Sequence, residues 1–402
     1  MEKRKLRIGL FQSNIRWEDK QYNYERLEKI LQEPSAKNLD CIFLPEMSFT
    51  GFSMNVQSMA EDDEATIRIM SDYAKKHHVV LGFGWTGCRT DQIFENHYTI
   101  VDDEGKVLSD YVKNHPEKRA EDLLQAFRDP EIDMILCAIG GDDTYRLLPY
   151  LFDHNELAEA VTDKVFLGFS DTTINHFMLR KAGLNTFYGQ AFLPDICELS
   201  PEMHPYTRKY FEELISTGTI KEIIPSDVWY EERKCFAPDQ IGKALICHPD
   251  HGFELLQGAE MFSGKILGGC IDSMYDFFNG DRYSDMPVLC EKYRLFPDAD
   301  EWKGHILLLE SSEEKPSPEK YRQALAYLKN RGIFDAVSGV LVGKPMDETY
   351  AQEYRKQLIE VIDNPDLPVV FNINIGHAMP RCIIPFGIEA VVDAANQIIR
   401  FA

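Results

Sequence analysis

The sequence lacks several features that mark whole classes of protein. It contains no run of about 18 apolar residues, so a membrane-spanning helix is excluded. The basic start is followed by an apolar stretch that Gln12 soon interrupts, and we expect no signal peptide. The nine cysteines form no Cys-x-x-Cys pair, which favours reduced thiols in the cytoplasm over a disulfide framework.

Positive charge is also scarce. The chain has 43 Lys and Arg against 66 Asp and Glu, a formal net charge of -23. Such a chain repels phosphate backbones and anionic membranes, so neither nucleic acid nor a membrane is an expected partner. At 402 residues the chain is too long for one ordinary core, and we expect more than one domain.

Strand and helix patterns alternate over the first two hundred residues. The expected strands are 6–11, 41–44, 79–85, 96–101, 107–112, 134–139 and 165–169. The expected helices are 24–31, 67–77, 117–127, 146–152 and 173–182. This alternation predicts an α/β fold with a mostly parallel sheet flanked by helices.

The remaining sequence predicts a linker and a second α/β domain. Residues 201–240 are rich in Pro, Glu and Lys and read as a linker with one helix, while 241–402 read as the C-terminal domain. Its expected elements are strands 306–309, 337–342 and 368–373 and helix 318–331. With the segments 1–113 and 114–200, the chain divides into four parts.

Three strand ends carry groups suited to catalysis. Gly140 and Gly141 follow one strand and precede Thr144 at the start of a helix, while Glu310 and His377 each end an apolar strand. Ligands of open parallel sheets gather at such ends. Each feature alone is more often a turn, a cap or a structural histidine.

Together the three side chains supply a hydroxyl, an imidazole and a carboxylate. These groups are sufficient to activate a weak nucleophile. His377 would take the proton of Thr144, and Glu310 would orient the imidazole and balance its charge. The sequence therefore predicts a metal-free, cofactor-free hydrolase.

Residues 113–402 resemble the LD-carboxypeptidase family, in particular its microcin C immunity branch. The matching blocks are 115–151, 165–179, 264–274, 306–314 and 372–387. The resemblance implies a flavodoxin-like half followed by a C-terminal α/β domain, paired as a homodimer. It also implies a Ser-His-Glu triad, carried over to Thr144, His377 and Glu310. The implied substrate is a murein peptide or a peptidyl or aminoacyl nucleotide.

One position departs from that family pattern, because Thr144 replaces the nucleophilic serine. The extra methyl group restricts χ1 and crowds the path of attack, which keeps open an inactive homologue that only binds its ligand. Gly140, Gly141 and the amide of Asp143 are candidates for the oxyanion hole. The stretch around Trp229 resembles the one in which the immunity proteins place aromatic residues against a nucleobase, while an ordinary core or surface tryptophan is the more common role of such a residue.

Four other polar residues are not expected to take part in catalysis or metal binding. A cap is the expected role of Ser170 and Asp171, which resemble a strand-end block of the family. The sequence CHPDH, with His248 and His251, lacks a matching third ligand nearby and predicts no metal site.

Residues 1 to about 116 instead resemble the first half of a nitrilase-type carbon–nitrogen hydrolase. The resemblance is carried by the blocks 6–17, 43–52 and 95–116, and it assigns Glu46 as general base and Lys113 as the stabilising cation. Cys137 alone is placed as the nucleophile, yet it lacks the usual Tyr-Asp after it. We therefore expect a fused chain whose nitrilase-like βαβ units stand in for the missing part of the peptidase sheet, with a nitrilase-type hydrolase as the alternative.

Overall fold

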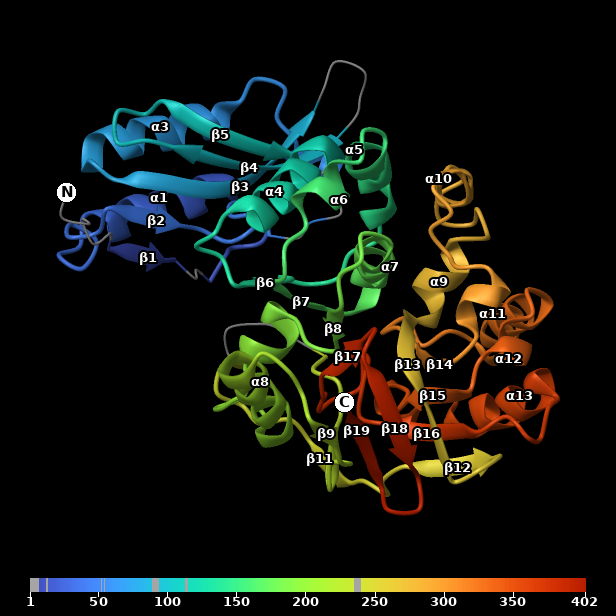
Figure 1. Ribbon diagram of the computed structural model, residues 1–402. Coiled ribbons are helices and arrows are strands. Elements are labelled where there is room, and N and C mark those ends of the chain that lie inside the picture. The colour runs from blue at the N-terminus through green and yellow to red at the C-terminus, as the bar shows by residue number, and fades with distance from the viewer. Residues whose placement is uncertain are drawn as a thin grey trace. The chain divides into compact units, whose positions relative to one another are not determined.

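Apolar strands and amphipathic helices alternate along the chain, as its residue pattern predicts. The computed structural model describes residues 7–11, 14–51, 53, 55–88, 94–112, 115–234 and 240–402. The chain forms two compact units, Met1–Lys118 and Arg119–Ala402, and Figure 1 shows the elements of each. The α/β fold class is confirmed.

The first unit contains one five-stranded sheet. Its strands, in their order across the sheet, are β1 (Ile8–Leu10), β2 (Cys41–Phe43), β3 (Val80–Cys88), β4 (Phe94–Val101) and β5 (Val107–Val112). Strands β1, β2 and β3 are parallel, whereas β4 and β5 add as antiparallel neighbours. Its helices are α1 (Lys20–Leu31), α2 (Val56–Met59) and α3 (Ala65–His77). Helix α1 begins at Lys20 because the Asp19 carboxylate accepts the amide hydrogen of Tyr22.

The second unit begins with a four-stranded sheet of order β17-β8-β7-β6. Strands β6 (Met134–Leu136), β7 (Val165–Gly168) and β8 (Thr186–Tyr188) are parallel, and β17 (Ile384–Phe386) pairs antiparallel with β8. The helices of this region are α4 (Pro116–Arg128), α5 (Leu148–Phe152), α6 (Glu156–Ala160), α7 (Thr173–Lys181) and α8 (Pro205–Thr217). The sequence predicted that the nitrilase-like βαβ units replace the missing part of this sheet. The structure differs, because the strands of the first unit form a sheet of their own.

The larger sheet of the second unit has eight strands in the order β12-β16-β15-β14-β13-β18-β19-β9. Four of them are parallel: β13 (Met261–Cys270), β14 (His305–Glu310), β15 (Gly339–Gly343) and β16 (Val369–Ile373). The antiparallel strands are β9 (Glu222–Ile223), β12 (Glu254–Gln257), β18 (Glu389–Asp393) and β19 (Ile398–Phe401).

Helices accompany this sheet on the side seen at the right of Figure 1. They are α9 (Ile271–Asp276), α10 (Met286–Lys292), α11 (Pro318–Asn330), α12 (Ile333–Ala336) and α13 (Ala351–Ile362). Strands β15 and β16 are buried along their whole length, which explains why they read as unbroken apolar runs. Among the described helices, none has the length and apolar character needed to cross a bilayer.

The segment 201–240 is not the linker that its composition suggests. Its Pro205 starts helix α8, β9 forms an edge of the large sheet, and β10 (Val228–Tyr230) pairs with β11 (Cys247–Pro249). Proline and charged residues here serve a helix start and an exposed helix face. Most of this segment therefore belongs to the second unit as ordered structure.

Candidate active site

The carboxyl ends of strands from both sheets of the second unit meet at Glu310, the last residue of β14. Its side chain is fully buried. The Oε1 atom accepts a hydrogen bond of 2.6 Å from the hydroxyl of Tyr188, which ends β8 in the other sheet. This contact joins the two sheets at one polar point.

His377 completes a buried pair with Glu310. Its Nδ1 atom lies 2.8 Å from Oε2 of Glu310, and its backbone N–H donates to the same oxygen at 3.3 Å. The preceding Gly376 makes this approach possible, because its φ is +89° and a Cβ there would lie 2.4 Å from that carboxylate oxygen. The contact of Glu310 with Nδ1 fixes the orientation of the imidazole ring and leaves Nε2 on its other side.

A second carboxylate lies on the opposite side of the ring. Oε2 of Glu313 is 2.9 Å from Nε2 of His377, although this nitrogen makes no aligned hydrogen bond with any described residue. Burial lowers the pKa of His377, but the charge of Glu310 and the contacts with both carboxylates outweigh it and raise the pKa to about 10. The interaction with His377 in turn lowers the pKa of Glu313 to about 2. The imidazole is therefore held in its charged form.

Thr144 lies eight residues beyond the end of β6, at the start of a 3₁₀ helix that covers Thr144–Leu147. Its N–H donates to Oδ2 of Asp171 at 3.0 Å. Burial raises the pKa of Asp171 to about 6, and hydrogen bonds from the Thr144 hydroxyl and amide offset part of that rise. Asp171 thus holds the candidate nucleophile, which is more than a helix cap does.

The short stretch after β7 connects Thr144 with His377. The ring of Phe169 meets the imidazole edge-on, with centroids 5.1 Å apart, and Asp171 binds Thr144 two residues later. Between them, Ser170 lies so close to Gly140 that a Cβ on that glycine would be 2.7 Å from the serine side chain. The three predicted groups thus share one region, although Thr144 and His377 make no hydrogen bond with each other in the described structure.

The residues proposed for the oxyanion hole lie beside Thr144. Gly141 has a φ of +147°, a conformation suited to glycine. The Asp143 carboxylate accepts hydrogen bonds from both terminal nitrogens of Arg119, at 2.8 and 2.9 Å. This fork fixes the chain next to the candidate nucleophile. The amide of Thr144 is already used by Asp171.

Trp229 lies in β10 and its ring stacks on His248 of β11, with centroids 4.5 Å apart. His248 in turn contacts Glu231 at 2.8 Å, so its ring is committed to this arrangement. The neighbouring Tyr230 donates its N–H to Met379 in the loop that carries His377. The aromatic pair is therefore close in the fold to the imidazole loop.

One group in the described part of the chain has ligand atoms near enough to share a metal ion. The atoms of Cys270, Glu310 and His377 lie within 4.8 Å of one another. Burial, followed by the charge of Glu310, raises the pKa of the Cys270 thiol well above its usual value. A protonated thiol is a poor ligand, and both Glu310 oxygens already accept hydrogen bonds. These donors fit a hydrogen-bonded pair better than a metal centre.

Of the three nitrilase-like residues, the structure describes Glu46 and Cys137. Glu46 accepts a hydrogen bond from the side-chain amide of Asn96 within the first unit, and Lys113 lies outside the described residues. Burial raises the pKa of Cys137 to about 12, so this side chain is a thiol at neutral pH. Nothing in these contacts activates a cysteine nucleophile.

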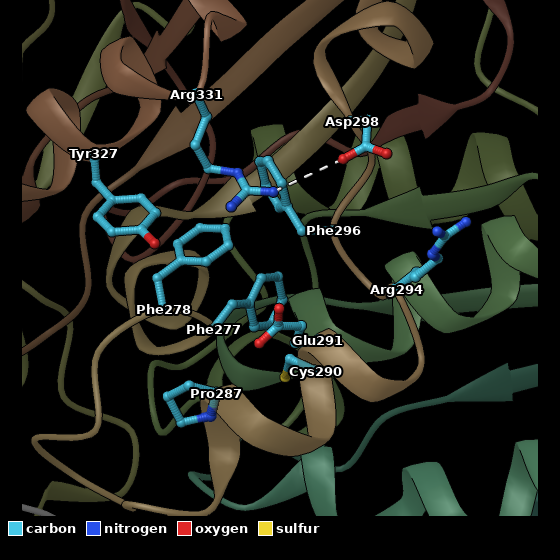
Figure 2. Close-up of a pocket in the computed structure, with 10 residues that line it drawn as sticks. All are labelled: Phe277, Phe278, Pro287, Cys290, Glu291, Arg294, Phe296, Asp298, Tyr327 and Arg331. Atoms are coloured by element: carbon cyan, nitrogen blue, oxygen red, sulfur yellow. Dashed lines mark ion pairs between the residues drawn. The ribbon is translucent and has the colours of Figure 1, made fainter.

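A separate pocket of about 350 Å³ contains none of these groups. Figure 2 shows Phe277, Phe278, Phe296 and Tyr327 around it, with Arg331 over the ring of Phe278 at 4.8 Å. Four of its ten lining residues are aromatic and four are charged. The lining also includes Cys290, and burial raises the pKa of its thiol to about 12, so this side chain is not a nucleophile at neutral pH. The side chains suited to catalysis therefore lie at the strand ends and not in this pocket.

Comparison with known proteins now identifies the family. Models of the LD-carboxypeptidase N-terminal and C-terminal domains match residues 88–189 and 263–392. A crystal structure of an MccF-like protein from Streptococcus pneumoniae, in complex with AMP, is 56% identical with a TM-score of 0.72 and covers 75% of this chain and 87% of that one. The chain belongs to the LD-carboxypeptidase family. This member of the family is an amide-bond hydrolase, and the family predicted from its sequence is confirmed.

Three further comparisons differ in how much of each chain they cover. The microcin C7 self-immunity protein MccF of Escherichia coli is 25% identical over 293 residues, 70% of this chain and 77% of its own length. An MccF structure with aspartyl sulfamoyl adenosine shares the fold at 23% identity, with a TM-score of 0.58 and coverage of 73% and 82%. The Omega-amidase YafV of Yersinia enterocolitica is 29% identical over 110 residues, 27% of this LD-carboxypeptidase and 41% of the amidase.

Three residues of the site were not predicted from the sequence. Tyr188 ends a short strand, and a polar residue at a strand's carboxyl end was an available signal. Glu313 stood unremarked in the run that follows Glu310. Arg119 lies on a helix far from Asp143 in sequence, and no local pattern points to their pairing.

Proposed function

We propose that this LD-carboxypeptidase hydrolyses the amide bond of an aminoacyl or peptidyl nucleotide through Thr144, His377 and Glu310. The observation that carries the proposal is the buried Glu310–His377 pair at 2.8 Å, adjacent to the stretch that binds Thr144. A carboxylate on Nδ1 leaves Nε2 as the atom that exchanges protons with a nucleophile. The other residues then have definable roles.

In the proposed reaction the Thr144 hydroxyl turns from Asp171 to Nε2 of His377 and attacks the substrate carbonyl. Once the resting imidazolium has released its Nε2 proton to solvent, Nε2 accepts the hydroxyl proton while Glu310 stabilises the imidazolium that forms again. Amides of Gly140, Gly141 and Asp143 would stabilise the oxyanion. The imidazolium then protonates the leaving nitrogen, and water hydrolyses the acyl-threonine ester by the reverse proton transfers.

A nucleotide leaving group is favoured by the stacked pair of Trp229 and His248. The ring of Trp229 is itself buried, with His248 stacked on it and Nζ of Lys344 5.4 Å from its centroid. The part of this pair that is open to a nucleobase is therefore the His248 ring, whose side chain is 38% exposed. The Streptococcus pneumoniae relative, 56% identical, is seen with AMP, and MccF is seen with aspartyl sulfamoyl adenosine. A murein peptide is the second candidate because the family is that of LD-carboxypeptidases.

A hydrolysis assay tests the proposal. Aspartyl sulfamoyl adenosine and a murein tetrapeptide are each incubated with wild type, Thr144→Ser, His377→Ala and His251→Ala, and products are followed by mass spectrometry. We expect hydrolysis of the nucleotide conjugate, at least equal rates in Thr144→Ser, and loss in His377→Ala. The exposed His251 is the control and should leave the rate unchanged. Tight binding without product by every variant would instead establish a binding-only homologue.

The family resemblance also leads us to propose a homodimer and a cytoplasmic location. Sedimentation of the purified protein would test the first, and cell fractionation the second.

A further inference from the structure

The position of Glu313 has a consequence for substrate choice. Its side chain is 57% exposed, whereas the imidazole that it contacts is 6% exposed. Nε2 of His377 is the atom that the proposed function requires for proton exchange, and the Glu313 carboxylate lies 2.9 Å from it. In this arrangement both the imidazole and Thr144 are held by acidic side chains, Glu313 and Asp171. The arrangement is therefore an inactive one, in which Nε2 of His377 does not accept the proton of Thr144.

We propose that Glu313 is a specificity-determining residue that binds the free α-ammonium group of an aminoacyl substrate and thereby releases Nε2 of His377 to Thr144. The inference rests on the proposed function and narrows its substrates to aminoacyl nucleotides, because the residue at the scissile bond of a peptidyl nucleotide has no free α-ammonium group. In an aminoacyl conjugate, a single carbon separates the α-amine from the scissile carbonyl. An exposed carboxylate next to the catalytic base is within reach of that amine.

Charge balance explains why the expected group is a cation. Glu313 is paired with the imidazolium at rest, and an ammonium group can replace this partner while the imidazolium releases its Nε2 proton to solvent water. A neutral or anionic group at that position offers the carboxylate no replacement.

Nearby cations form their ion pairs with other acids, although the charge of Arg282 also acts on Glu313 and lowers its pKa. Arg282 forms an ion pair with Glu314, and Nζ of Lys320 lies 3.9 Å from the carboxylate of the same residue. Lys315 contacts Glu232 at 2.9 Å and Asp347 at 2.7 Å. Glu313 is therefore the acidic residue of this turn whose short ion-pair contact is with the catalytic imidazole.

The other ionisable groups around His377 lie on three elements. Glu310 binds Nδ1, and Cys270 at the end of β13 is a neutral thiol close to the same carboxylate. Arg381 donates to the backbone oxygen of His377 at 2.8 Å, and its charge is balanced by Asp195 at 2.7 Å. Of these groups, Glu313 alone combines exposure with contact to Nε2.

Binding of two matched ligands tests the inference without turnover. In a Thr144→Ala background, the affinity for aspartyl sulfamoyl adenosine is compared with that for its N-acetyl derivative by calorimetry. We expect the free amine to bind at least about tenfold more tightly. Glu313→Gln should abolish this ratio, and Glu314→Gln, the adjacent acid paired with Arg282, should preserve it.

Imidazole NMR supplies a second readout. The pKa of His377 should fall by about 1 to 3 units in Glu313→Gln, because one of the two charges that favour the imidazolium is gone. The free-amine ligand, but not its N-acetyl derivative, should produce a similar fall in Thr144→Ala.

An affinity ratio that persists in Glu313→Gln would be steric in origin and would overturn the inference. So would a His377 pKa that Glu313→Gln leaves unchanged, or failure of both ligands to bind. Hydrolysis by the wild-type enzyme is judged separately from its products. Turnover with an unchanged ratio would leave the proposed function standing while this inference fails.

Discussion

Replacing Glu310 with glutamine should damage catalysis far more than folding. Glutamine keeps the volume of the buried side chain, and it can still accept from Nδ1 of His377 and donate to the hydroxyl of Tyr188. What it removes is the charge that favours the imidazolium. We expect kcat to fall roughly 10³- to 10⁴-fold, the scale on which an orienting acid acts in a hydrolase triad.

The stability effect has a definite pH signature. Because the folded-state pKa of His377 is raised to about 10, its stabilising contribution is fully present below about pH 6.5 and is lost as the pH rises toward 10. Between pH 6 and pH 9 the wild type should lose about 3 kcal/mol from this group. The difference in unfolding free energy between wild type and Glu310→Gln should shrink by up to that amount.

Urea unfolding at both pH values, alongside steady-state kinetics, measures these effects. Glu314→Gln removes an exposed charge a few residues away and serves as the control for general electrostatics. A constant stability difference across this pH range would refute the coupling between Glu310 and His377. Near-wild-type kcat in Glu310→Gln would refute the assigned role.

Three further changes probe the surroundings of the pair. Tyr188→Phe should lower the unfolding free energy by about 1.5 to 3 kcal/mol because Oε1 of Glu310 loses its donor, and a thermal melt that shows no change would contradict this. Gly376→Ala should reduce both stability and rate, since a Cβ there would lie 2.4 Å from the Glu310 carboxylate; unaltered melting and kinetics would show that the loop adapts freely. Cys137→Ser should keep wild-type activity within a few fold because its thiol stays protonated at neutral pH, whereas a lost rate would revive the nitrilase alternative.

The division of the chain is open to a direct experiment. Limited proteolysis should cut near residues 113–118, where the two compact units adjoin in sequence, and release fragments that remain folded. Cleavage is followed by intact mass. A chain that resists cleavage there and unfolds in a single cooperative step would argue against a fused origin.

Strands buried on both faces were predictable, because they must be apolar throughout. The expected strand 306–309 corresponds to β14 (His305–Glu310), and helix 318–331 to α11 (Pro318–Asn330). The polar residue that ends such a strand is conspicuous, which is why Glu310 could be chosen. His377 was recognised in the same way, from an apolar strand followed by glycine.

Contacts across sheets could not be predicted from local patterns. The bond from Tyr188 to Glu310 joins residues 122 positions apart, and that between Arg119 and Asp143 joins a helix to a loop. Pairing of Glu313 with His377 likewise depends on how the turn after β14 faces a distant loop. Periodicity specifies which residues are buried, but not which polar partners meet.

The chemical identity of the nucleophile is best tested by locating the acyl group during turnover. Wild type and Thr144→Ala are mixed with aspartyl sulfamoyl adenosine, quenched in acid within milliseconds to seconds, and digested for mass spectrometry. We predict an aspartyl ester on the peptide that contains Thr144 in the wild type, and neither adduct nor product in Thr144→Ala. An adduct on another residue, or product formation by Thr144→Ala at the wild-type rate, would contradict hydrolysis through the threonine hydroxyl.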